Sequence, residues 1–290
     1  MHPAPSVIFF TAFSGLGFGL LAWLGIGLPP VHGWVAFTFY FIAYAMAVGG
    51  LLASVFHLAN PKNAIKAFSQ WRSSWLSREG IIAIAALLTM APHAVMQIFL
   101  DTAFRPLGAL GAALCLATVF TTSMIYTQLK TVARWNTPFT PALFLLYALA
   151  GGALLAGQTR PAAALLILLG LTQIAAWLHG DKQGATGATT LETATGLGAI
   201  GKTRLLEPPH TGQNYLLNEM AYSVGRKHSL KLRLIALTLG AALPAVLLLA
   251  LPVTHTIALI AVLCHILGLL AARWLFFAEA AHVVRLYYGK

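Results

Sequence analysis

Residues 80–100 read GIIAIAALLTMAPHAVMQIFL, a run of 21 residues without Asp, Glu, Lys or Arg. A helix of this length rises about 30 Å, which is the thickness of the hydrocarbon core of a bilayer. The whole chain has the same character: of its 290 residues, 59% are hydrophobic and only 9% are charged. An average soluble domain has about a quarter of its residues charged. The composition therefore predicts an integral membrane protein.

Apolar runs long enough to span a bilayer occur eight times along the chain. The connections between them are short, except for residues 180–231, which we expect to form a long polar loop. Short connections favour antiparallel neighbours, so the sequence predicts a single all-α membrane domain over residues 1–290, a bundle of eight transmembrane helices. The predicted spans are 6–27, 35–57, 80–100, 107–128, 140–157, 161–179, 232–251 and 256–278.

The net charge of +11 comes from 18 Lys and Arg against seven Asp and Glu. With eight spans, sixteen of the basic residues fall on the side that holds both termini, and only Arg105 and Arg160 fall on the other. Because cytoplasmic loops carry an excess of Lys and Arg, both termini and the 180–231 loop are expected on the cytoplasmic side of a bacterial inner membrane. Scattered loop charges do not form the clustered basic face of a nucleic-acid-binding protein.

The densest polar sequence at a predicted membrane boundary connects the second span to the third, from His57 to Glu79. Glu79 is the first acidic residue of the chain. The second span ends near His57 and the third begins near Glu79, so in antiparallel helices both side chains are expected at the same cytoplasmic depth. Ionisable groups at membrane depth are candidates for function, and this pair suits a small polar ligand that exchanges protons.

A structural role would account for the same residues. Glu79 would then cap its helix and pair with Arg78 or Arg72, and His57 would be an interfacial residue. Trp71 and Trp75 fit the aromatic belt that lines a membrane interface. The spacing alone leaves both interpretations open.

The two short patterns HLANP (57–61) and SWLSRE (74–79), together with eight spans, resemble the DmsC family. Its members are the membrane anchor subunits of dimethyl-sulfoxide-reductase-type molybdoenzymes. The segment RWNT (134–137) resembles the connection between that family's fourth and fifth helices. Residues 206–220 and 275–289 look more like the sulfite-oxidising branch, the membrane subunits of sulfite dehydrogenases.

This resemblance implies a three-subunit complex. The partners would be a molybdopterin catalytic subunit and an iron–sulfur subunit with four [4Fe–4S] clusters, both on the cytoplasmic face, with membrane lipid around the anchor. The anchor would exchange electrons with a quinone, ubiquinone or menaquinone, and the family's residues that match His57 and Glu79 are associated with the quinone site. Ala59-Asn60 and Arg78 depart from the pattern of bacterial dimethyl sulfoxide reductase, which leaves the quinone type open.

The chain itself has few candidate cluster ligands. Its two cysteines, Cys115 and Cys264, lie inside apolar runs, so electrons are expected to pass directly from the partner's nearest cluster to quinone. In this hypothesis His57 hydrogen-bonds one quinone carbonyl and Glu79 relays a proton. The side chains of Ser74, Ser77 and Arg78 would orient the quinone head group or bind phospholipid.

The charge asymmetry favours one direction of electron flow. Bacterial dimethyl sulfoxide reductase exposes its catalytic pair to the periplasm, whereas four basic residues between the second and third spans place the docking side of this chain in the cytoplasm. With residues 206–220, this favours cytoplasmic oxidation of sulfite, with electrons entering the quinone pool. The alternative is the anchor of a quinol-oxidising dimethyl sulfoxide or polysulfide reductase.

Two other classes of membrane protein stay open. A cytochrome anchor with haem b needs intramembrane histidine ligands, and His93 and His265 are expected near one depth. A secondary transporter usually shows repeated halves, and the chain has no convincing internal repeat. On the anchor hypothesis, the 180–231 loop is a candidate clamp for the iron–sulfur subunit.

Overall fold

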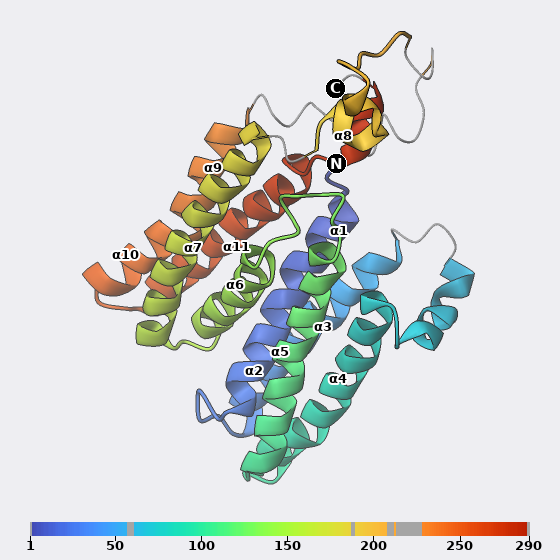
Figure 1. Ribbon diagram of the computed structural model, residues 1–290. Helices are drawn as coiled ribbons and strands as arrows, with labels where there is room; N and C mark the ends of the chain where they lie inside the picture. The colour runs from blue at the N-terminus through green and yellow to red at the C-terminus, as the bar shows by residue number, and fades with distance from the viewer. Residues whose placement is uncertain (1, 57–60, 187–188, 208–211, 213–227, 289–290) are drawn as a thin grey trace.

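The computed structural model of the chain describes residues 2–56, 61–186, 189–207, 212 and 228–288. Every regular element in these ranges is a helix, and none of them is a strand. The long helices lie side by side and run alternately in opposite directions (Figure 1). The predicted all-α bundle is therefore confirmed.

Seven helical segments in the described part of the chain are long and apolar enough to cross a membrane. Each coincides with a predicted span. Two of them contain one turn of π-helix, η1 (Phe10–Ser14) and η6 (Thr238–Ala242). In chain order the segments are α1 (Pro5–Phe9) with η1 and α2 (Gly15–Gly25); α3 (Gly33–Val55); α4 (Trp75–Phe99); α5 (Arg105–Thr127); α7 (Thr159–Thr186); α9 (Ser229–Leu237) with η6 and α10 (Leu243–Ala250); and α11 (His255–Ala278).

The remaining predicted span, 140–157, forms a shorter helix, α6 (Phe139–Leu155), of 17 residues. It lies inside the bundle, packed against α2, α5 and α7. A turn in which Gly157 has a φ of +65° follows α6 and leads directly into α7. Length and composition thus identify seven of the eight predicted crossings, and α6 is shorter than the others.

The backbones of α2 and α6 are in direct contact. A Cβ atom at Gly19 would overlap the carbonyl oxygen of Ala148, and one at Gly152 would overlap the backbone of Gly19. Small residues allow helices in lipid to approach this closely. The close approach adds dispersion contacts along the whole interface between α2 and α6, which stabilise the pair. This close contact with α2 holds α6 in the middle of the bundle.

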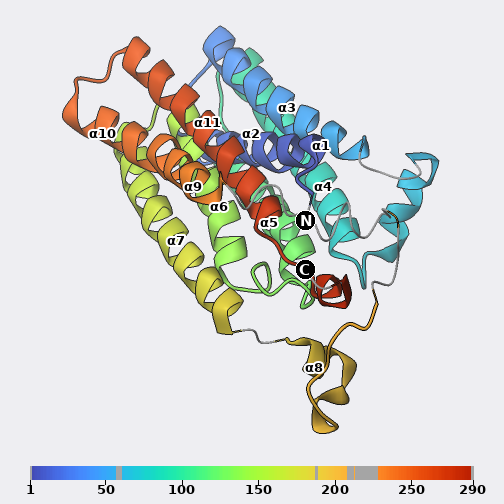
Figure 2. The ribbon, with the colours of Figure 1, turned by 90° about the horizontal axis from the view of Figure 1, so that it is seen from above.

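Both ends of the chain lie at the same end of the bundle as the short helix α8 (Leu191–Thr195) (Figure 1), which stands out from the bundle in the view from above (Figure 2). The last turn, η7 (Val283–Tyr288), folds back to α8, where the Tyr287 hydroxyl donates to the Ala194 carbonyl at 3.1 Å. The loop predicted at 180–231 begins instead as helix, because α7 continues to Thr186, and it contains α8 and η3 (Leu197–Ala199). Most of residues 206–220 lie outside the described residues.

Candidate functional site

Glu79 lies in the second turn of α4 and is buried, with 4% of its surface exposed. The helix begins at Trp75, earlier than the predicted start at residue 80, and Ser74 is its N-cap residue. The expectation that Glu79 caps its helix is therefore wrong. The Glu79 carboxyl group is buried against α5, inside the bundle, and does not cap the helix end.

The partner of Glu79 is Thr122, on the neighbouring helix α5. The distance between Glu79 Oε1 and Thr122 Oγ1 is 2.5 Å, and Thr122 Oγ1 lies 2.9 Å from the Thr118 carbonyl oxygen. A hydroxyl group has one proton and cannot donate to both acceptors at once. Both contacts are satisfied when Glu79 carries a proton and donates to Thr122 while Thr122 donates to Thr118. This arrangement suits a carboxyl group that holds and releases a proton.

Arg78 does not pair with Glu79, so this part of the structural interpretation is also wrong. The Arg78 guanidinium donates to the carbonyl oxygens of Trp71 at 2.9 Å and Arg72 at 2.6 Å. It also lies over the Trp75 ring, 4.4 Å from the ring centroid. The side chain of Arg78 therefore connects the start of α4 to the segment before it. Arg72 also forms no ion pair within the described residues.

The other predicted quinone ligands surround the start of α4. Ser77 is buried and Ser74 is half-buried. The preceding 3-10 helix η2 (Pro61–Gln70) brings the Phe68 ring against Gly80, next to Glu79. His57 lies outside the described residues, so its juxtaposition with Glu79 stays a prediction.

The RWNT segment attaches the connection between α5 and α6 to the end of α11. The Trp135 indole N–H donates to the Phe276 carbonyl at 2.9 Å, and its ring stacks on Phe276 with centroids 5.1 Å apart. The Asn136 amide donates to the Thr127 carbonyl at 2.6 Å, at the end of α5. Tyr126 packs edge-on to Trp135 and Phe276. Trp135 and Asn136 of the RWNT pattern therefore each have a structural role, because each binds a backbone carbonyl at the end of another helix.

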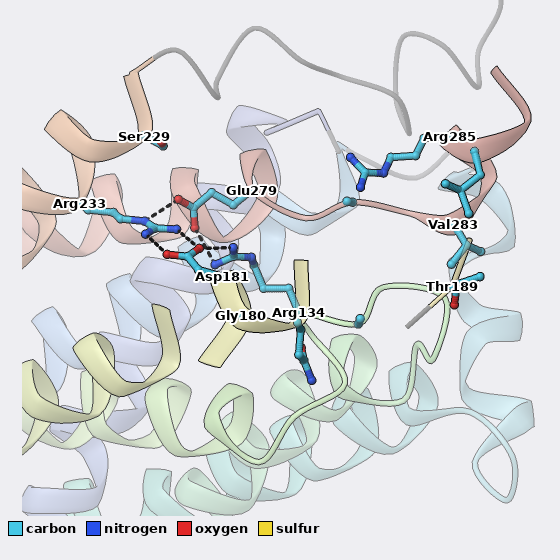
Figure 3. A pocket seen from close by; sticks show the side chains of 13 residues that line it. Arg134, Gly180, Asp181, Thr189, Ser229, Arg233, Glu279, Val283 and Arg285 are labelled. Carbon is cyan, nitrogen blue, oxygen red and sulfur yellow. Dashed lines mark hydrogen bonds and ion pairs between the residues drawn. The ribbon is translucent and has the colours of Figure 1, made fainter. Parts of the chain in front are cut away.

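Four charged side chains form an ion-pair cluster at the end of the bundle that holds the termini (Figure 3). Asp181 accepts from Arg134 at 2.6 Å and from Arg233 at 2.6 and 2.7 Å. Glu279 accepts from Arg233 at 2.7 Å and from Arg134 at 3.2 Å. Each carboxylate thus lies between the same two guanidinium groups, and the cluster is neutral overall.

The ion-pair cluster lines a cavity of about 360 Å³, together with Arg285 and Thr189. Its four residues come from the α5–α6 connection, the last turns of α7, the start of α9 and the residue after α11. The cluster could not be predicted from the sequence, because its members are 46 to 145 residues apart along the chain and share no local pattern. The only signal was that Arg134 and Glu279 fall in segments that resemble the family.

His93 and His265 pack against different helices. His93 on α4 lies against Gly108 of α5, where a Cβ atom would come within 2.8 Å of its ring. His265 on α11 has its Nδ1 2.6 Å from the Gly240 carbonyl oxygen and its Nε2 close to Gly151 of α6. Each ring thus packs against the backbone of a neighbouring helix, and haem ligation by His93 and His265 stays a prediction.

The fold and site define a multi-pass helical membrane protein with a buried carboxyl group near one end of its bundle. Residues 1–165 match the family described as DMSO reductase anchor subunit (DmsC). Over 328 aligned positions, the chain is 33% identical to a subunit of the sulfite dehydrogenase of Allochromatium vinosum, with 99% of each chain covered. No solved structure matches the chain. The chain belongs to the DmsC family, as the HLANP and SWLSRE patterns predicted.

Family membership establishes the general role. DmsC proteins are membrane anchors of DMSO-reductase-type molybdoenzymes, and such an anchor implies a catalytic and an iron–sulfur partner subunit. It also implies, in general terms, interaction with quinone and cofactors that belong to the partners. These statements apply to the class and do not specify the substrate of this chain.

Proposed function

We propose that the chain is the quinone-reactive anchor of a molybdoenzyme complex that oxidises sulfite in the cytoplasm and delivers the electrons to the quinone pool. The observation that carries this proposal is Glu79, a buried carboxyl group that contacts Thr122 near the end of the bundle. The relative that belongs to a sulfite dehydrogenase, similar over nearly the whole chain, supports sulfite as the electron donor.

The proposal includes eight crossings, with α6 as the eighth. Two observations support this count: both chain ends lie at the same end of the bundle, which requires an even number of crossings, and 17 residues is the lower limit for a spanning helix. With eight crossings, sixteen of 18 basic residues lie on one side. The positive-inside rule then places that side in the cytoplasm and the protein in a bacterial inner membrane.

The residues around Glu79 would supply protons and hydrogen bonds to the substrate quinone. Reduction to quinol consumes two electrons, from the partner's clusters, and two protons, taken up from the cytoplasm. Glu79 donates a proton toward one quinone oxygen and regains one from the cytoplasmic side, while Thr122 holds its carboxyl group in place. We assign to His57 a hydrogen bond to the other oxygen, and to Ser74, Ser77 and Arg78 the orientation of the head group.

Inner-membrane vesicles that carry the whole complex provide the test. Sulfite is expected to reduce added ubiquinone or menaquinone analogues, and the faster of the two identifies the quinone type. In the control, the two soluble subunits without this chain should oxidise sulfite with a water-soluble dye but not with quinone. Quinol-dependent reduction of dimethyl sulfoxide, without sulfite oxidation, would overturn the proposal.

A further inference from the structure

Arg273 is a buried cation within the membrane-spanning helix α11, with 4% of its surface exposed. No carboxylate forms an ion pair with it in the part of the chain that the structure describes, and its Nε–H group has no hydrogen-bond acceptor there. The acid nearest to it along α11, Glu279, is already bound by Arg134 and Arg233. Burial of a guanidinium without a counter-ion is costly, so this arrangement requires compensation.

Aromatic rings compensate part of this cost. The Cζ atom of Arg273 lies 3.6 Å from the centroid of the Phe144 ring and 5.4 Å from that of Tyr147. A cation–π contact uses the face of the guanidinium, whereas its N–H donors point outward in the guanidinium plane. The face of Arg273 is therefore covered, while the Nε–H donor at its edge lacks an acceptor.

Arg273 lines a cavity of about 50 Å³ between α6, α7 and α11. The same cavity is lined by Tyr147, Gln173 and Trp177, and by Arg134 and Glu279 of the ion-pair cluster, whose charges are paired with each other. The Tyr147 hydroxyl donates to the Gln173 side-chain oxygen at 3.2 Å, so the amide N–H groups of Gln173 are further donors in this lining. A space of this size accommodates a phosphate or carboxylate group and is too small for a quinone ring.

The depth of this cavity in the membrane indicates the source of an anion. Arg273 is five residues before the end of α11, which corresponds to about 7.5 Å along the helix axis. That end of the helix is followed by Glu279 of the ion-pair cluster, at the end of the bundle that holds the termini. Arg273 is thus close to the level of the lipid head groups, where arginine side chains commonly meet phosphate.

We propose that the cavity at Arg273 binds one phosphate group, supplied by an anionic phospholipid of the leaflet on that side. The phosphate oxygens accept from the in-plane N–H donors of Arg273 and from the amide of Gln173, and the acyl chains leave along α7 past Trp177. This site is separate from the one at Glu79, and the bound lipid would join α6, α7 and α11.

Native mass spectrometry of the purified complex tests this binding. The wild-type complex is titrated with phosphatidylglycerol and with phosphatidylcholine of the same acyl chains, with and without inorganic phosphate. We expect wild type to bind one phosphatidylglycerol at least tenfold more tightly than phosphatidylcholine. Arg273→Gln should lose this preference, whereas Arg160→Gln, at an exposed arginine near the start of α7, should keep it.

Inorganic phosphate distinguishes the two sources of the same group. If millimolar phosphate leaves the bound phosphatidylglycerol in place, the lipid is the ligand; if phosphate displaces it, the site takes the free anion instead of the lipid, and the lipid source is wrong. Equal binding of the two lipids by wild type would overturn the whole proposal, and that measurement requires no variant. If Arg273→Gln does not fold, Gln173→Leu replaces it and should weaken phosphatidylglycerol binding several-fold.

Discussion

Glu79 and Thr122 show how one hydroxyl group accommodates an acid inside an apolar bundle. A buried carboxylate needs a cation or several donors, and the structure gives Glu79 a neutral threonine while Arg78 binds backbone carbonyls instead. A protonated Glu79 satisfies this environment. Release of that proton is favourable only when an acceptor such as a quinone oxygen is nearby, which is the property required of a proton relay.

Replacement of Glu79 by glutamine tests the relay. Glu79→Gln keeps the shape and hydrogen-bonding capacity of the side chain but has no proton to transfer. We expect sulfite-dependent quinone reduction to fall about 100-fold, while sulfite oxidation with a water-soluble dye is unchanged because it bypasses this chain. Glu192→Gln, on the surface helix α8, is the matched control and should leave both rates unaltered. A wild-type quinone rate in Glu79→Gln contradicts the assignment.

Thr122 is expected to act by positioning Glu79. Thr122→Val removes the hydroxyl at nearly constant volume, and the loss of one buried hydrogen bond should lower the quinone reduction rate about tenfold. Thr122→Ser keeps the hydroxyl and should restore most of the rate. Steady-state kinetics with a soluble quinone analogue measures both variants. Equal losses in Val and Ser would show that the methyl group matters, rather than the hydrogen bond.

Among the helices, the ion-pair cluster connects elements that are distant in the chain. It joins the ends of α7 and α11 to the start of α9 and to the α5–α6 connection, next to the Trp135 contact with Phe276. Asp181, in the part of α7 that continues beyond the predicted end, is held by two arginines. The cluster therefore keeps the last turns of α7 helical and fixes how the C-terminal helices sit against α6.

A double-mutant cycle measures this connection. Asp181→Asn and Arg233→Gln are each expected to lower the free energy of unfolding by about 1–2 kcal/mol, because each removes two of the four ion pairs and leaves the cluster with one uncompensated charge. The double variant should lose less than the sum of the two, by about 1 kcal/mol, as measured by denaturant unfolding in detergent. Arg285 lines the same cavity but forms no ion pair with Asp181 in the described residues. The effect of Arg285→Gln should therefore add to that of Asp181→Asn.

For the molecule as a whole, the position of the chain ends and the distribution of charge point to the same topology. Both ends and α8 lie at one end of the bundle (Figure 1), where the ion-pair cluster joins the ends of α7 and α11. Nearly all basic residues belong to that side when eight spans are counted. The partner subunits of a sulfite-oxidising complex would dock on this face. The opposite end has the short α6–α7 connection and Arg160.

Cysteine labelling tests this topology. In a background without Cys115 and Cys264, Arg160→Cys is expected to react with a membrane-impermeant maleimide in intact cells. Lys202→Cys should react only after the inner membrane is permeabilised, because the excess of Lys and Arg holds its side in the cytoplasm. Labelling is read as a mass shift on a gel, with the cysteine-free chain as the control. Labelling of Lys202→Cys in intact cells would reverse the orientation.

Most helices could be located from apolar run length, and the two largest boundary errors have a common cause. The start of α4 and the end of α7 both extend past the predicted spans, to Trp75 and to Thr186. In each case polar residues that end an apolar run remain helical because a distant partner satisfies them: Thr122 for Glu79, and Arg233 for Asp181. A pattern of hydropathy cannot detect a partner on another helix.

The linear sequence was sufficient to predict a helical membrane protein, the positions of its spans and its family, and to single out Glu79 as a candidate. Transfer of a segment into lipid depends on the length and polarity of that segment alone, so it can be evaluated locally. Only the tertiary structure revealed the Thr122 partner, the ion-pair cluster and the unpaired guanidinium of Arg273. Contacts between helices depend on how each helix is rotated and packed against its neighbours, and these are properties of the assembled bundle.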